Sequence, residues 1–119
     1  MVVHQTQQLA LSDDEVDRIF RALADATRRD LVRRTLTEDA SISDLAHRYE
    51  MSFAAVQKHI TVLEGAGLVT KHRSGRERRI RGNPDAIRRA QTLLNTYERL
   101  WQGRVDRLDA LLAEDRPPQ

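Results

Sequence analysis

The sequence contains no cysteine, which excludes disulfide bonds, zinc sites built from thiolates and thiol-based redox sensing. Aromatic residues make up only 4% of the chain, so a core must be built mainly from leucine, valine, isoleucine and alanine. The apolar runs are far too short to span a bilayer, and residues 1–11 lack the apolar segment of a signal peptide. We therefore expect a cytoplasmic protein that does not bind a membrane.

Length and charge narrow the class of protein further. A chain of 119 residues suits one small domain, and 32% charged residues with few aromatics favour helices over sheets. The net charge of +2 is modest, but residues 71–81 carry six lysines or arginines against one glutamate. Acidic residues gather instead between Asp13 and Asp17. This uneven distribution makes residues 71–81 a candidate site for a polyanion.

Residues 52–66 have the pattern of a helix with one buried face. Ser52 is a typical N-cap residue, and Val56, Ile60 and Leu63 recur at helical spacing. The opposite face carries short and nearly uncharged side chains, which allow close approach to another molecule. These side chains belong to Ala54, Ala55, Gln57, Lys58 and Thr61.

A two-stranded β-hairpin is expected directly after this helix. Gly67 tolerates the left-handed backbone that ends many helices, and an extended, β-branched run follows it. Ser74 and Gly75 form a turn signal that separates residues 68–73 from residues 77–81. The helix thus leads into a strongly basic hairpin.

Three helices are predicted before this segment. The first begins at a capping box in residues 12–15 and ends near residue 24. The second begins after the N-cap candidate Asp25 and ends before the polar residues 37–40. The third spans residues 43–49 and is joined to the next helix by a tight turn. This order predicts a helix-turn-helix.

A long C-terminal helix starts at Asn83 and Pro84, a cap followed by a residue suited to the first helical position. Its apolar residues follow steps of three and four over roughly seven or eight turns. So small a domain cannot bury this whole stripe, and we expect a dimer interface rather than packing within the chain. The predicted interface residues are Phe20, Leu94, Tyr97, Trp101, Val105, Leu108 and Leu112.

Taken together, these segments resemble the arsenic-responsive repressor (ArsR) family of winged helix-turn-helix regulators. The resemblance rests on residues 20–29, 45–46, 56–60 and 63–69, and it covers the chain from about Phe20 to Glu114. It implies a mainly α fold with a small β-hairpin that dimerises through its long C-terminal helix and its N-terminal helix. It also implies a homodimeric repressor that binds a palindromic operator in double-stranded DNA and releases it when an effector binds.

This reading divides the chain into three parts. Residues 1–11 form a flexible segment, residues 12–115 form the DNA-binding and dimerisation domain, and residues 116–119 form a disordered tail.

Two familiar metal sites of the resembled family are missing. Metal-sensing members carry a Cys-x-Cys-Asp-Leu motif in the third helix, where this chain has Ser41-Ile-Ser-Asp-Leu45, and hydroxyls do not replace thiolates. Other members place Asp and His ligands along the terminal helix, whereas residues 84–115 contain no histidine. The stretch 97–109 is similar to a metal-independent branch of the family. We expect no resident metal or cofactor, and an effector that is a small molecule or a metal ion.

The basic hairpin is expected to contact phosphates. Lysines and arginines that displace condensed counterions gain affinity whatever the base sequence. The candidates are Arg73, Arg76, Arg78 and Arg79, and Arg76 at the turn is favoured for entry into a minor groove.

Sequence is expected to be read by the preceding helix in the major groove. Gln57 can pair with adenine, and Lys58 is the second polar reader. Phe53 and Ala54 stand where many relatives have polar residues, so they favour apolar contacts, although Phe53 alternatively packs under the turn.

Several other polar residues have simpler expected roles. Ser52 and Thr61 are each within reach of a phosphate. His59 adjoins the buried stripe and is expected to be structural. Residues 27–29 are expected to cap and support the second helix.

Three alternatives stay open. A metal-responsive repressor could bind Ni, Zn or Mn at a non-standard site, although only His47 and Glu50 have a spacing that places them on one helix face. Its possible ligands are His4, His47, Glu50, His72, Glu98, Asp106 and Asp109. A protein-interaction module would use the hairpin and the long helix, but the hairpin is more basic than a protein partner needs. An enzyme is the least supported, because paired carboxylates beside a histidine are missing.

Overall fold

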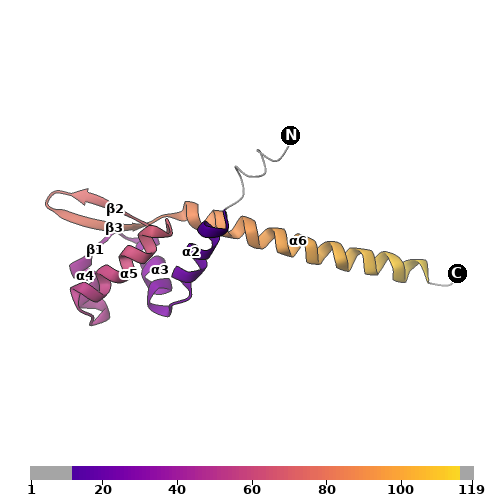
Figure 1. Cartoon of the computed structure of the whole chain (residues 1–119), viewed down its shortest axis with the longest axis horizontal. Coiled ribbons are helices and arrows are strands. Elements are labelled where there is room, and N and C mark those ends of the chain that lie inside the picture. The colour runs from indigo at the N-terminus through magenta and orange to yellow at the C-terminus, as the bar shows by residue number, and fades with distance from the viewer. Residues whose placement is uncertain (1–11, 116–119) are drawn as a thin grey trace.

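The computed structural model describes residues 12–115, and Figure 1 shows their arrangement. The flexible segment and the disordered tail that we predicted, residues 1–11 and 116–119, lie outside the described residues, as does His4. The elements are α2 (Asp13–Leu23), α3 (Ala26–Thr37), β1 (Ala40–Ser41), α4 (Ile42–Tyr49), α5 (Phe53–Gly65), β2 (Val69–Ser74), β3 (Glu77–Gly82) and α6 (Pro84–Glu114). The prediction of a mainly α fold with a small sheet is confirmed.

The helices begin at side chains that satisfy their free backbone N–H groups. The predicted caps Ser12, Asp25, Ser52 and Asn83 each accept a hydrogen bond from the first turn of their helix. The predicted start of the third helix at residue 43 is wrong. Ser41 caps α4 in a capping box with Asp44, so the helix begins at Ile42.

A C-terminal cap at Gly67 and Leu68 ends α5 and sets the residue at which the hairpin begins. Gly67 adopts a φ of 73°, and the N–H of Leu68 donates to the carbonyl of Leu63 at 2.9 Å. Leu68 therefore closes the helix instead of beginning the strand, and β2 starts one residue later than predicted.

The sheet has three strands rather than the predicted two. Its order is β1-β3-β2, and both pairings are antiparallel. The additional strand β1 pairs Ala40 with Ile80 and Ser41 with Arg79. Two residues are too few for a recognisable strand pattern, and the pairing arises because α3 ends beside β3. The central position of β3 joins the hairpin, here called the wing, to the helical domain.

One core holds the domain together. Every helix from α2 to α5, the sheet and the first turns of α6 contribute apolar side chains to it. The residues with no exposed surface include Leu31, Leu45, Val56, Ile60, Leu63, Leu68 and Ile80. The buried face predicted for α5 is therefore confirmed. Each such side chain contributes about 1.5–3 kcal/mol through removal of its apolar surface from water.

Helix α6 leaves the domain after its first two turns (Figure 1). Only Ala86 and Ala90 of its 31 residues are buried. The apolar residues from Leu94 to Leu112 are mostly exposed, with Trp101 at 60% and Leu112 at 63%. The alternative of packing within the chain is thus wrong for this part of the helix.

Within residues 12–115, no helix is both long enough and apolar enough to cross a membrane.

Gly82 provides a test of how closely α3 and β3 approach each other. A Cβ added at this buried position would lie 2.8 Å from the backbone nitrogen of Leu36 and would also meet its side chain. We therefore expect Gly82→Ala to lower the free energy of unfolding by about 1–3 kcal/mol, measured by urea denaturation. The control is Gly65→Ala, whose added Cβ meets nothing within 4 Å. Equal stability of the two variants would contradict this packing.

Candidate nucleic-acid interface

A tight turn sets the angle between α4 and α5. Glu50 follows α4 with a left-handed backbone, φ 52° and ψ 41°. Met51 then donates its N–H to the carbonyl of Ala46 at 3.1 Å, which closes the end of α4. Ser52 starts α5 immediately afterwards. The predicted helix-turn-helix is therefore present, with a non-glycine residue in a conformation that costs some free energy.

A polar network holds α4 against α3. The hydroxyl of Tyr49 donates a hydrogen bond to Asp30, and the guanidinium of Arg34 lies 5.4 Å from the centre of the tyrosine ring. The hydrogen bond from Tyr49, together with nearby Arg33, lowers the pKa of Asp30. Burial and the same carboxylate raise the pKa of Tyr49. Sequence reasoning missed this network, because Tyr49 lies 15 or more positions from its partners Asp30 and Arg34.

The side of α5 opposite its buried residues is exposed to solvent over most of its length. We call Phe53, Ala54, Gln57, Lys58 and Thr61 the reading face. Phe53 is 56% exposed at the first helical residue, so the alternative that it packs under the turn is wrong. The face also includes a hydrogen bond from Gln57 Nε2 to Thr61 Oγ1 at 3.3 Å.

Three further residues lie in α5 or at its N-cap. Ala55 is half-buried at the edge of the reading face, and Ser52 uses its hydroxyl to accept from the N–H of Ala55 at 3.1 Å. Val62, which the sequence reasoning did not single out, is 42% exposed.

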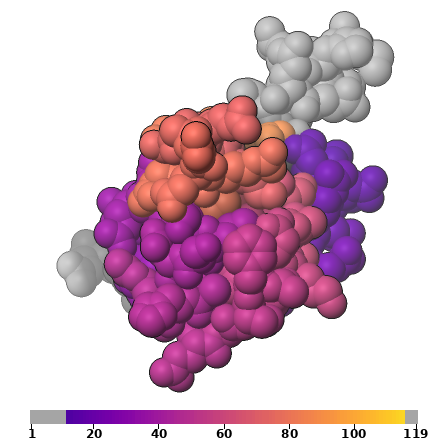
Figure 2. All heavy atoms as spheres, turned by 90° about the vertical axis from the view of Figure 1, so that its left-hand side faces the viewer, coloured from indigo at the N-terminus to yellow at the C-terminus, as the bar shows by residue number. Residues whose placement is uncertain are grey.

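Viewed from the side of α4 and α5, the wing stands directly above the surface that these helices form (Figure 2).

The two faces of the wing are different, because side chains alternate along a strand. Lys71 and Arg73 pair with Ile80 and Arg78, and these four residues form the inner face. Ile80 is fully buried, and Lys71 Nζ lies 3.5 Å from the carboxylate of Glu64 in α5. The inner face is therefore the one directed towards α5.

Arg73 and Arg78 are direct cross-strand neighbours on the inner face. Like charges in such a position destabilise a hairpin, so this pair costs free energy in the isolated protein. Arg76 lies beyond them at the turn, next to Gly75 with its φ of 63°. Within residues 12–115, no carboxylate forms an ion pair with any of these three arginines. Their positive charge is available to an external polyanion.

Arg79 is not brought together with the other three predicted arginines. It lies on the outer face of the wing with Thr70, His72, Ser74, Glu77 and Arg81. Its guanidinium donates to Glu77 at 3.1 Å and to the carbonyl of Asp39 at 2.9 Å. The structure thus gives Arg79 an internal partner that its sequence position did not reveal.

Arg28 and Arg29 of α3 contact the end of α2, and His59 of α5 lies beside Arg28. Arg28 donates from Nε to the carbonyl of Ala22 at 2.7 Å, and Arg29 donates to the carbonyl of Leu23 at 2.7 Å. Both arginines therefore satisfy carbonyls at the end of α2. His59 Nδ1 lies 3.5 Å from Arg28 Nη1, which places the imidazole in the same structural cluster.

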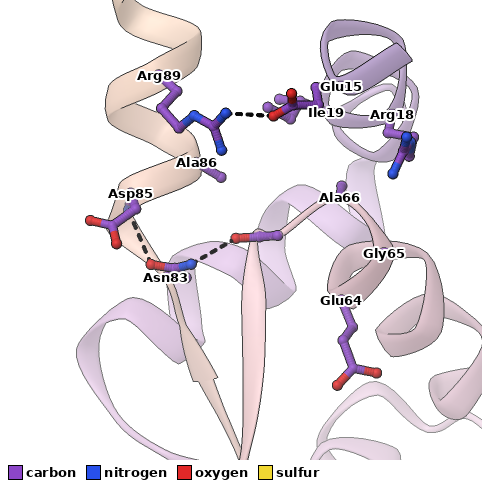
Figure 3. A pocket seen from close by; sticks show the side chains of 11 residues that line it. Glu15, Arg18, Ile19, Glu64, Gly65, Ala66, Asn83, Asp85, Ala86 and Arg89 are labelled. Atoms are coloured by element: carbon purple, nitrogen blue, oxygen red, sulfur yellow. Dashed lines mark hydrogen bonds and ion pairs between the residues drawn. The ribbon is translucent and has the colours of Figure 1, made fainter. Parts of the chain in front are cut away.

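Among residues 12–115, no group of three or more histidines and carboxylates is placed to hold a metal ion. An open cavity of about 330 Å³ lies between α2, the end of α5 and the start of α6 (Figure 3). Arg89 and Glu15 form an ion pair across it, and Asn83 Nδ2 donates to the carbonyl of Gly67 at 3.0 Å. None of the predicted site residues lines this cavity.

Comparison with known proteins gives the class to which this architecture belongs. No family model matches the chain. The chain is 42% identical over 69 residues to YuzN, an uncharacterised HTH-type transcriptional regulator of Bacillus subtilis, in a match that covers 52% of this chain and 75% of YuzN. It is 34% identical over 81 residues to the HTH-type transcriptional regulator Rv2034 of Mycobacterium tuberculosis, covering 68% of this chain and 76% of that protein.

Solved structures agree with these relatives. An ArsR-like transcriptional regulator from Rhodococcus sp. RHA1 is 30% identical and superposes with a TM-score of 0.74, covering 82% of this chain and 92% of the other. The architecture is thus that of a winged helix-turn-helix domain. The chain belongs to the ArsR family of transcriptional regulators, which are not enzymes.

Proposed function

We propose that this regulator is a homodimeric repressor that binds a palindromic operator in double-stranded DNA and releases it when an effector binds. The observation that carries the proposal is the placement of the reading face of α5 beside the inner face of the wing, with Arg73 and Arg78 paired across the strands. A relative 27% identical over 60 residues, SdpR of Bacillus subtilis, is a transcriptional repressor, which supports repression.

The reading face suits the major groove. An α-helix fits this groove when short side chains allow its backbone to approach the base edges, and Ala54 and Thr61 meet that need. Gln57 can pair with adenine through two hydrogen bonds once it exchanges its contact with Thr61. Phe53 lies in the first turn of α5, the part of a recognition helix that contacts bases, and offers an apolar surface to a thymine methyl.

The wing supplies the contacts that do not depend on sequence. Phosphates relieve the repulsion between Arg73 and Arg78, so DNA binding recovers the free energy that this pair costs in the isolated protein. Arg76 is exposed at the turn between β2 and β3, a position that suits contact with the DNA backbone or entry into a minor groove. A protein partner would not require three arginines in one place that lack a carboxylate partner within residues 12–115, which disfavours the interaction module.

The exposed apolar side chains of α6 are the main part of the proposed dimer interface. At about 100° per residue, its apolar side chains occupy a sector of about 140°. This apolar sector consists of Leu93, Leu94, Tyr97, Leu100, Trp101, Val105, Leu108, Leu111 and Leu112. Such a sector is wider than the seam between two helices. A second copy can cover it with α6 and α2 together, because Phe20 of α2 is also 37% exposed.

Twofold symmetry gives the complex two equivalent reading faces. A dimer of this kind binds half-sites whose centres lie about one helical turn of DNA apart, or a multiple of it. The proposal can be tested by letting the full chain select duplexes from a random-sequence library. The enriched duplex is then titrated at several KCl concentrations. Failure to enrich any sequence, or binding without salt dependence, would lead us to abandon it.

Substitution of Arg78 tests the role of the wing. We expect Arg78→Ala to weaken binding to every duplex by a similar factor and to reduce the slope of log Kobs against log salt by about one, because one phosphate contact is lost. The measurement is a fluorescence anisotropy titration. Arg88→Ala is the matched control, since Arg88 is exposed on α6 and pairs with Asp85 at 2.9 Å. An unchanged slope in Arg78→Ala would remove this residue from the interface.

Substitution of Gln57 tests sequence reading. We expect Gln57→Ala to lose about 1–3 kcal/mol of discrimination at one base pair of each half-site while the salt slope stays the same. The measurement compares the enriched duplex with single-base variants. Gln91→Ala, on the exposed surface of α6, serves as the control and should keep the wild-type preference. Uniform weakening across all duplexes would show that Gln57 does not read a base.

Substitution of Trp101 tests the dimer. A glutamate in the centre of the apolar sector would be buried without a partner, so Trp101→Glu should give a monomer in analytical ultracentrifugation and bind the enriched duplex far more weakly. Ala110→Glu lies on the opposite side of the helix and is the control, expected to stay dimeric. A wild-type chain that is monomeric at micromolar concentration would contradict the interface.

A further inference from the structure

The wing is held at its base by side chains on both of its faces. On the inner face, Lys71 Nζ lies 3.5 Å from the carboxylate of Glu64 in α5. On the outer face, the guanidinium of Arg81 donates to both carboxylate oxygens of Asp39, at 3.0 and 2.8 Å. The angle between the wing and the helical domain is thus braced from two sides.

Asp39 also contacts β3 through its main chain. Its carbonyl accepts a hydrogen bond from Arg79 Nη2 at 2.9 Å. The next two residues form β1, which pairs with Ile80 and Arg79. The short connection between α3 and α4 is therefore joined to the wing by a carboxylate, a carbonyl and a strand pairing. This junction lies directly before the helix-turn-helix begins.

The tip of the wing has no comparable support within residues 12–115. A two-stranded ribbon twists and bends readily, so the contacts at its base determine where its tip lies. A small rotation at the base displaces Arg76 by a larger distance, because Arg76 is at the far end of the ribbon. Residues at the base can therefore change DNA affinity without touching DNA.

We propose that Asp39 is a positioning residue for DNA binding, which orients the wing relative to α5 by holding Arg79 and Arg81. Neither arginine is then a phosphate contact. This inference rests on the proposed function. The positioning role and simple electrostatics predict opposite changes in DNA affinity. Removal of a negative charge beside phosphates ordinarily tightens binding. A positioning role requires binding to weaken.

The test compares Asp39→Asn with Glu38→Gln in the full chain, using the duplex enriched from the random library. Glu38 is the adjacent residue and pairs with Arg48 of α4 at 3.1 Å, so the control removes the same charge without a contact to the wing. We expect Asp39→Asn to bind about two- to fivefold more weakly, the range that corresponds to the energies of exposed ion pairs, with an unchanged salt slope. Glu38→Gln should bind as tightly as the wild type or more tightly.

A double-variant cycle shows whether Asp39 acts through Arg81. If it does, Asp39→Asn added to Arg81→Gln should leave the affinity of Arg81→Gln unchanged. Arg81→Gln alone keeps the proposal falsifiable if Asp39→Asn does not fold, because it breaks the same contact and should weaken binding with an unchanged salt slope. Thermal unfolding and the active fraction, titrated at stoichiometric concentration, separate lost affinity from lost protein. A merely structural role would lower the active fraction and leave the affinity of the folded protein unchanged.

Besides that structural outcome, two results would overturn the role of Asp39. Tighter binding by Asp39→Asn with a steeper salt slope would mean that Asp39 masks two phosphate-binding arginines. Additive effects in the cycle would mean that Asp39 and Arg81 act independently. If the wild-type chain binds no duplex at all, the proposed function fails first, and the role of Asp39 falls with it.

Discussion

The structure depends on the burial of one face of α5. Val56, Ile60 and Leu63 have no exposed surface and pack into a core shared by α2, α3, α4 and the sheet. Because a helix presents its side chains in all directions, this burial forces Gln57, Lys58 and Thr61 to the opposite side. The orientation of the reading face thus follows from the same packing that stabilises the domain. A loss of that packing would affect stability and recognition together.

In the wing, too, the burial of one side chain determines the direction of its neighbours. Ile80 is buried, so its neighbours Arg79 and Arg81 are directed to the outer face, while Arg78 shares the inner face with Arg73. A single buried position therefore sorts the arginines of β3 into two groups. One group is braced by Asp39, and the other stays without a carboxylate partner in the described part of the chain. A basic stretch that is uniform in sequence thus has two different environments in space.

Much of the fold could be predicted because its signals are local. Caps such as Ser12 and Ser52 act within four residues, and the buried stripe of α5 repeats at helical spacing. The strand β1 could not be predicted, because two residues carry no pattern and their partner lies about forty positions away. The start of α4 was missed for a related reason, since two serines lie close together and only Ser41 has the geometry of a cap.

The sequence by itself determined the class of protein through its resemblance to a known family. It also determined the position of α5 and the wing and the length of α6, because periodicity and turn chemistry act over short distances. Only the tertiary structure decided which arginines of the wing have a carboxylate partner within residues 12–115 and whether Phe53 is exposed. It also decided that α6 leaves the core after Ala90. These features depend on contacts such as Asp39 with Arg81, whose partners are 42 residues apart. No local pattern encodes such a contact, since it forms only after the core has placed α3 beside β3.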